Sequence, residues 1–276
     1  MPCPYVLGDL VVPLATRREL ELLWAWASHG HVAFRTGGAG ERLRSREGIV
    51  ALFAGPPGTG KTMAAQALAR HLGLTLLRID LSRVVNKYIG ETEKNLDAAF
   101  AEAEAVGAIL FFDEADALFG KRSEIKDAHD RYANTETGYL LQRLESHRGI
   151  VLLATNLQRN LDDAFLRRIQ IVAEFPLPGP EERLAIWRRH LDPERCAHDL
   201  DLPYLAQAHA LSGGEIKNAI TTAVLLSPSA DAPLAMVHLV LGVWRELRKS
   251  GRLVTPADFG PWAPMVAAYV GAAPSA

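Results

Sequence analysis

The feature that most constrains this chain is a glycine-rich segment, Gly55-Pro56-Pro57-Gly58-Thr59-Gly60-Lys61-Thr62, which fits the pattern G-x-x-x-x-G-K-[S/T]. An apolar run, Ile49 to Ala54, precedes it, and a segment of helical periodicity, Lys61 to Leu72, follows it. The backbone N–H groups of such a loop, together with the N-terminus of the next helix, attract phosphate. The segment therefore predicts a strand-loop-helix unit in which residues 56–62 contact a nucleotide. Lys61 is expected to reach the β- and γ-phosphates, and Thr62 to ligate Mg²⁺.

Further apolar runs recur along the chain with the same character. They are Leu74 to Ile79, Ala108 to Phe112, Ile150 to Ala154 and Ile171 to Phe175. Each run is continuous and not alternating, as expected for a strand that is buried on both faces of a parallel sheet. Helix-period segments, including Glu91 to Ala105 and Tyr132 to Ser146, lie between them. We therefore predict a three-layer α/β domain with a parallel five-stranded sheet.

The clearest break in the chain is Pro176-Leu177-Pro178-Gly179-Pro180, because three prolines exclude both a helix and a central strand. The segments beyond it suit helices, and no strand run follows, so a small all-α lid is expected there. Near the start, Thr16 to Trp26 reads as a helix that opens with a Thr16/Glu19 capping pair. The predicted organisation is an N-terminal segment (1–48), a large α/β domain (49–178), a small helical domain (179–260) and a C-terminal tail (261–276).

Paired carboxylates end one of the predicted strands, at Asp113-Glu114. Downstream of a phosphate-binding loop, this pair predicts that Asp113 holds the magnesium shell and that Glu114 polarises an attacking water. An apolar strand that ends in Asp-Glu is also a common exit into a loop. The catalytic interpretation of Asp113-Glu114 therefore depends on the phosphate-binding loop that precedes it in the sequence.

Several motifs together resemble the AAA+ ATPases. They are Gly55 to Thr62, Asp113-Glu114-Ala115-Asp116, Ala154-Thr155-Asn156, and Leu161-Asp162-Asp163-Ala164-Phe165-Leu166-Arg167-Arg168. The resemblance implies binding of ATP and ADP with Mg²⁺, a water-orienting role for Asn156, and arginine fingers at Arg167 and Arg168 that act on a neighbouring subunit. Arg168 is the first choice for the finger. The chain departs from relatives with Arg-x-x-Arg spacing, because Gln170 and Ile171 follow instead.

The same resemblance extends to both ends of the chain. Leu211 to Asn218 is similar to the region in which a glycine pair approaches adenine, which implies nucleotide contacts for Gly214 and Lys217. No arginine occupies this region, and Lys217 could reach phosphate, but the sequence alone favours a surface lysine. Gly8-Asp9-Leu10-Val11 resembles the segment that covers the base, which makes Asp9 and Leu10 candidate nucleotide contacts.

Lys87-Tyr88-Ile89-Gly90 lies where AAA+ translocases carry the loop that lines their central channel. An aromatic side chain offers contact area at low rotamer cost, which suits a loop that grips many peptide sequences. The alternative is that Tyr88 and Ile89 pack onto the sheet. Lys121 to Asn134 is highly charged, and by the same resemblance it holds a second channel loop; a solvated loop fits its composition as well.

The sequence from Lys87 to Leu96 resembles the branch of the AAA+ group that contains protein unfoldases, microtubule-severing enzymes and membrane-complex disassembly enzymes. Bacterial relatives with a similar Tyr132 to Glu145 stretch occur beside contractile injection systems. The resemblance implies a homo-oligomeric ring, expected to be a hexamer, that threads protein substrates through its pore. Two other functions stay open, a nucleic-acid motor or loader and a nucleotide-dependent scaffold without turnover.

Composition excludes other classes of protein. The 276 residues are 49% hydrophobic and carry a net charge of −2, which gives no field for indiscriminate binding to nucleic acid. The two cysteines, Cys3 and Cys196, lack metal-ligand spacing, and the histidines form no metal constellation, so no transition metal is expected. No leader or bilayer-spanning stretch is evident. We expect a cytoplasmic protein with no membrane insertion.

Overall fold

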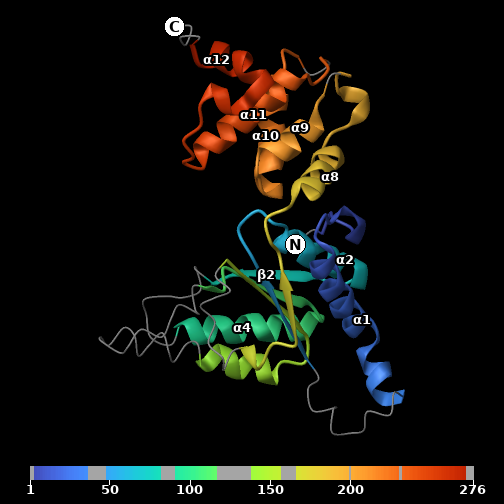
Figure 1. Cartoon of the computed structure of the whole chain (residues 1–276). Helices are drawn as coiled ribbons and strands as arrows, with labels where there is room; N and C mark the ends of the chain where they lie inside the picture. The colour runs from blue at the N-terminus through green and yellow to red at the C-terminus, as the bar shows by residue number, and fades with distance from the viewer. Residues whose placement is uncertain are drawn as a thin grey trace. The chain divides into compact units, whose positions relative to one another are not determined.

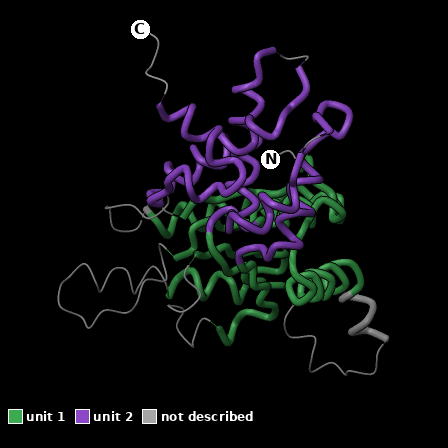
Figure 2. Tube along the Cα trace, turned by 45° about the horizontal axis from the view of Figure 1, so that its top comes forward, with its two compact units in different colours: residues 1–56, 60–176 green, residues 57–59, 177–276 purple. Residues whose placement is uncertain are grey.

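The computed structural model describes residues 3–36, 48–81, 91–116, 138–156, 166–198, 200–229 and 232–271. These residues form two compact units (Figure 2). Unit 1 comprises residues 1–56 and 60–176, and unit 2 comprises residues 57–59 and 177–276.

Unit 1 is built on a parallel sheet (Figure 1). Its strands are β1 (Ile49–Ala54), β2 (Leu76–Asp80), β3 (Ile109–Asp113), β4 (Ile150–Thr155) and β5 (Ile171–Glu174). They form a 5-stranded sheet in the order β2-β3-β4-β1-β5, and every pairing is parallel. The strands begin or end within two residues of the predicted runs. The predicted α/β class is confirmed.

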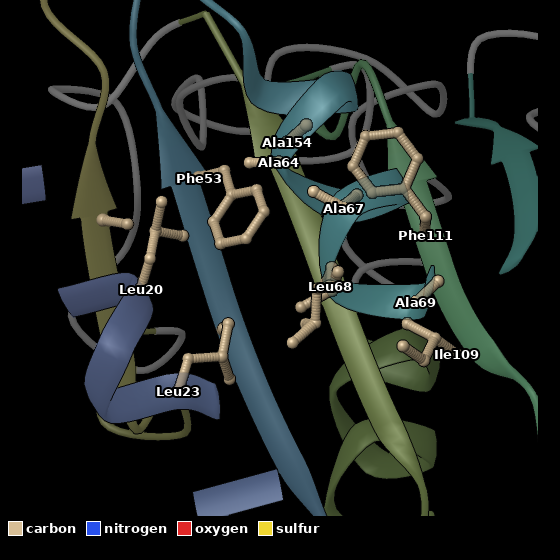
Figure 3. Packing of buried hydrophobic residues seen from close by; sticks show 14 of the residues in the cluster. Leu20, Leu23, Phe53, Ala64, Ala67, Leu68, Ala69, Ile109, Phe111 and Ala154 are labelled. Atoms are coloured by element: carbon tan, nitrogen blue, oxygen red, sulfur yellow. The ribbon is translucent and has the colours of Figure 1, made fainter. Parts of the chain in front are cut away.

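Helices cover both faces of this sheet. The helices of unit 1 are α1 (Leu14–Thr36), α2 (Lys61–Leu72), α4 (Glu91–Val106) and residues 138–146. Phe53, Phe111 and Ala154 point to one face, where they pack with Leu23 of α1 and Leu68 of α2 (Figure 3). The intervening strand residues point to the other face and pack with α4 and residues 138–146. Burial of alternate side chains on opposite faces explains why the strands read as continuous apolar runs.

The start of the chain differs from the predicted capping pair. A short 3₁₀ helix, η1 (Leu7–Asp9), precedes α1, and α1 already begins at Leu14. The Thr16 hydroxyl, instead of capping the helix, donates to the backbone carbonyl of Glu174 at the end of β5. The predicted Thr16/Glu19 cap is therefore wrong. Thr16 is buried, and its hydroxyl finds its partner on the sheet instead of on its own helix.

In the described residues of unit 2, the regular elements are helices, apart from an isolated bridge between Cys196 and Leu234. Its helices are α8 (Pro180–His190), η4 (Pro193–Arg195), α9 (Leu202–Ala208), α10 (Gly213–Leu226), α11 (Met236–Lys249), η5 (Pro256–Trp262) and α12 (Ala263–Gly271). Two of their starts are specified locally. Pro180 occupies the first turn of α8, and Ser212 and Glu215 form a capping box at α10.

Within the described ranges, none of the helices is both long and apolar enough to cross a membrane.

The core of unit 2 contains a buried histidine. His209 is only 6% exposed, and its ring packs on Phe259 with 4.7 Å between centroids. Burial lowers the pKa of His209 from 6.5 to about 4; the Asp258 carboxylate opposes this shift, and the Arg183 guanidinium adds to it. The folded protein therefore holds this imidazole in its neutral form.

We predict an acid-dependent loss of stability that His209→Phe reduces. Because the folded pKa is depressed, the unfolded chain binds the extra proton between pH 6.5 and pH 4, so stability is complete above pH 6.5 and falls below it. From pH 7 to pH 5 the native protein should lose about 2 kcal/mol more free energy of unfolding than the variant. Urea unfolding at several pH values measures both. If the free energy of unfolding depended equally on pH in the native protein and in His209→Phe, His209 would not be the group responsible.

Candidate functional site

The candidate site lies at the carboxyl edge of the sheet. β1 ends directly before Gly55, β3 ends in Asp113, and β4 ends directly before Asn156. Because the strands are parallel and in the order β3-β4-β1, these residues meet at one edge, which is where ligands bind in open α/β sheets.

The phosphate loop is shaped by its glycines. A Cβ at Gly55 would lie 2.0 Å from the carbonyl oxygen of Phe175, so no other residue fits where the loop passes β5. Gly60 is the N-cap of α2 with φ 107°, a left-handed conformation that favours glycine. No side chain caps α2, so the N–H groups of its first turn are available to phosphate oxygens.

Lys61 connects this loop to β4. Its ammonium donates to the carbonyl oxygens of Gly55 and Pro56, the latter at 2.9 Å, and to Oδ1 of Asn156 at 2.9 Å. The residue is 8% exposed. Burial lowers the pKa of Lys61, while the carboxylates of Asp113 and Asp116 raise it. The structure thus brings together two residues, Lys61 and Asn156, that are predicted from separate motifs.

The predicted carboxylates follow β3. Oδ2 of Asp113 accepts from Arg78 of β2, at 2.6 Å from Nη2 and 3.1 Å from Nε. Glu114 is exposed and has φ 54°, a left-handed conformation that costs energy for a residue with a side chain. A residue keeps such a conformation only where the surrounding structure holds it, and residues of this kind cluster at functional sites. This turn begins directly after Asp113, the residue that ends β3 and that is predicted to hold magnesium.

Asp116 and Arg78 belong to the site although their roles were not predicted. Oδ1 of Asp116 accepts from the hydroxyl of Thr155 and from the backbone N–H of Asn156, each at 3.3 Å. Asp116 thereby fixes the end of β4 that carries Asn156. Its place three residues after Asp113 was a usable signal. Arg78 gave none, because a charged residue within an apolar run reveals neither its register nor its neighbour.

The two predicted arginine fingers have different surroundings. Nε of Arg168 lies 2.5 Å from Oε1 of Glu145 in the same chain, whereas Arg167 is exposed. Gln170 accepts from the backbone N–H of Val50 at 2.6 Å and donates to the carbonyl of Arg168 at 2.9 Å. Gln170 therefore anchors this segment to β1.

Other predicted nucleotide contacts lie at both ends of the chain. In unit 1, Leu10 is buried and the Asp9 carboxylate accepts from the backbone N–H of Val6 at 2.8 Å. Residues 57–59 group with unit 2, in which the Gly214 N–H donates to the carbonyl of Gly58 at 2.8 Å. Lys217 is exposed on α10. Within unit 2, the absence of a side chain at Gly214 thus permits a close approach of the α10 backbone to Gly58.

The predicted channel residues Lys87, Tyr88 and Ile89 lie outside the described residues, as does the charged segment from Lys121 to Asn134. Among the residues that are described, no three or more His, Cys, Asp and Glu side chains gather as a metal site would require.

Residues 51–177 match the family described as the ATPase family associated with various cellular activities (AAA). The chain is 37% identical over 222 residues to the ATP-dependent zinc metalloprotease FtsH 3 of Sphaerobacter thermophilus, covering 75% of this chain and 45% of that protein. It is 34% identical over 208 residues to the proteasome-activating nucleotidase of Archaeoglobus fulgidus, covering 72% of this chain and 52% of that protein.

A further relative is the 26S proteasome regulatory subunit 6B homolog of Dictyostelium discoideum, which is 36% identical over 175 residues. That match covers 60% of this chain and 43% of the relative. The chain spans about half the length of these curated relatives.

We predict that Lys61→Met weakens binding of fluorescent ADP about 10- to 100-fold, since it removes a charge-assisted hydrogen bond to phosphate. Arg70→Met is the matched control, because Arg70 lies in the last turn of the same helix and is exposed. Titration of each purified variant measures the affinity. An equal loss in both variants would remove Lys61 from the site.

Proposed function

The chain belongs to the AAA family of ATPases, and on that premise we propose that it hydrolyses ATP, assembles into a ring and uses the cycle to remodel protein substrates. One observation carries the proposal. The Lys61 ammonium is held between the phosphate-loop carbonyls and the Asn156 amide, on the edge of the sheet where Asp113 and Glu114 follow β3. The groups proposed to bind phosphate, to bind metal and to orient water thus lie at the ends of three neighbouring parallel strands, β1, β3 and β4.

The residues of this edge fit the steps of phosphoryl transfer. The N–H groups of the loop and of α2 bind the phosphates, and Lys61 turns its charge towards the β- and γ-phosphates. Asn156 and Glu114 orient and polarise the attacking water, and Glu114 accepts its proton. Positioning and charge stabilisation supply most of the catalysis in this reaction class, so preorganised side chains matter more than covalent chemistry.

The donor set also fits magnesium. The Thr62 hydroxyl in the first turn of α2 and the Asp113 carboxylate are hard oxygen ligands of the kind that Mg²⁺ prefers, and they would hold it. When bound, the ion neutralises charge on the phosphates.

The arginines would complete the site of a neighbouring subunit. Arg167 is the better candidate for the finger, because it is exposed while Glu145 engages Arg168. Arg168 then positions the segment by its bond to α-helical residue Glu145. An arginine supplied from another subunit stabilises charge on the transferring phosphoryl group, which makes turnover depend on assembly. A hexamer is the ring size we expect.

Two further observations support a protein substrate. Relatives of this chain are named as proteasome-activating nucleotidase, 26S proteasome regulatory subunits and an ATP-dependent protease. The sequence Lys87-Tyr88-Ile89 suits a loop that grips a polypeptide. We place the protein in the cytoplasm, since its two cysteines lack any disulfide or metal pattern.

Glu114→Gln should lower phosphate release about 10²- to 10⁴-fold and leave ADP affinity nearly unchanged, because the amide keeps the shape of the side chain but cannot take a proton. Glu102→Gln, on the exposed face of α4, is the control. Phosphate release and nucleotide titration are measured on the same preparations. Near-normal turnover in the Glu114 variant would exclude its role.

Tyr88→Ala tests the protein-remodelling claim. Basal hydrolysis should persist, while stimulation by an unstructured polypeptide should fall, because force reaches a substrate only through side chains that hold it. Tyr88→Phe keeps the ring and should retain stimulation. If Tyr88 instead packs in the core, its removal would cost roughly 3–5 kcal/mol of stability and abolish basal hydrolysis as well. Thermal melting together with basal turnover separates these two outcomes.

A further inference from the structure

The carboxylate expected to face magnesium is already engaged by a cation of its own chain. Arg78 directs both Nη2 and Nε at the same oxygen, Oδ2 of Asp113, at 2.6 Å and 3.1 Å. The other oxygen, Oδ1, accepts the backbone N–H of Glu114 at 3.1 Å. Arg78 thus makes two hydrogen bonds to Oδ2, while the backbone donor occupies Oδ1.

The sheet explains how Arg78 reaches this carboxylate. β2 is an edge strand and pairs in register with β3, so Arg78 lies beside Phe111 and Asp80 lies beside Asp113. The Arg78 side chain extends from this edge strand to the Asp113 carboxylate, which lies two residues beyond Phe111 on β3. Its side chain is 46% exposed, whereas that of Asp113 is 16% exposed. The arginine can therefore leave the pair for solvent at little cost, while the carboxylate stays in place.

Two cations that share one carboxylate compete for it. A guanidinium on Oδ2 uses lone pairs that magnesium, or a water in its shell, needs, and the two positive charges repel each other. Any binding of magnesium at Asp113 must then include the free energy of breaking the Arg78 pair. Magnesium and nucleotide bind the same site, so this cost appears as weaker coupling between them.

We propose that Arg78 is a positioning residue that competes with magnesium for Asp113 and so limits how strongly magnesium tightens nucleotide binding. The inference rests on the proposed nucleotide site. Arg78 also orients the Asp113 carboxylate through its two hydrogen bonds to Oδ2. The residue therefore tunes the metal requirement of the site without contacting the nucleotide.

The test is a ratio of two dissociation constants for fluorescent ADP, the one measured in EDTA divided by the one measured in saturating magnesium, which grows as magnesium tightens binding more strongly. Arg78→Ala should raise this ratio about two- to fivefold, the range expected for loss of a partly exposed ion pair. Arg78→Gln should act in the same direction, since it lacks the charge, and Arg78→Lys should fall between it and the native protein. Arg148→Ala, an exposed arginine that follows the helix of residues 138–146, should leave the ratio unchanged.

The dependence on ionic strength separates an electrostatic role of Arg78 from a purely structural one, because salt weakens only the electrostatic effect. The difference in ratio between the native protein and Arg78→Ala should shrink in 0.5–1 M salt, because the Debye length falls towards about 3 Å. An unchanged or reduced ratio in both Arg78→Ala and Arg78→Gln would overturn the inference while leaving the nucleotide site intact. If the native protein binds ADP neither in EDTA nor in saturating magnesium, the proposed function and the inference are both overturned.

Discussion

The structure of this site depends on one buried ammonium. Lys61 opens α2, yet its side chain turns back to the carbonyls of Gly55 and Pro56 and across to the Asn156 amide. A lysine that is 8% exposed must find partners for its three N–H donors, and these are the partners it has. Satisfying them fixes the loop that follows β1 against the residue that follows β4. The side chain that is expected to bind phosphate is therefore also the one that shapes the phosphate loop.

Charges elsewhere on this edge are balanced in pairs. Burial lowers the pKa of Lys61, and Asp113 and Asp116 oppose that shift. Asp113 in turn pairs with Arg78, while Asp116 accepts from the Thr155 hydroxyl at the end of β4 and from the backbone N–H of Asn156 directly after it. Each carboxylate is thus held by hydrogen bonds before any substrate arrives, and preorganisation of this kind lowers the reorganisation needed during phosphoryl transfer. Among the described residues other than glycine, Glu114 is the one with a left-handed backbone, and it is exposed, which suits a group that must meet water.

The sequence allowed the sheet and the main site residues to be predicted, since strands buried on both faces read as continuous apolar runs and the loop motif has a fixed spacing. It did not reveal contacts that depend on strand order. Thr16 resembled a helix cap, but its hydroxyl binds the carbonyl of Glu174 on β5. Arg78 reaches Asp113 only because β2 pairs with β3 in one register. The difference between Arg167 and Arg168 likewise depends on Glu145, which is 23 residues from Arg168 in the chain.

The most direct measurement of the central claim is phosphate release from ATP by the native protein across a wide range of protein concentration, with magnesium and with EDTA. The account predicts release that requires magnesium, and a specific activity that rises with concentration towards a plateau, because an arginine of one subunit must reach the nucleotide of another. Release that never exceeds that of Lys61→Ala at any concentration would contradict it.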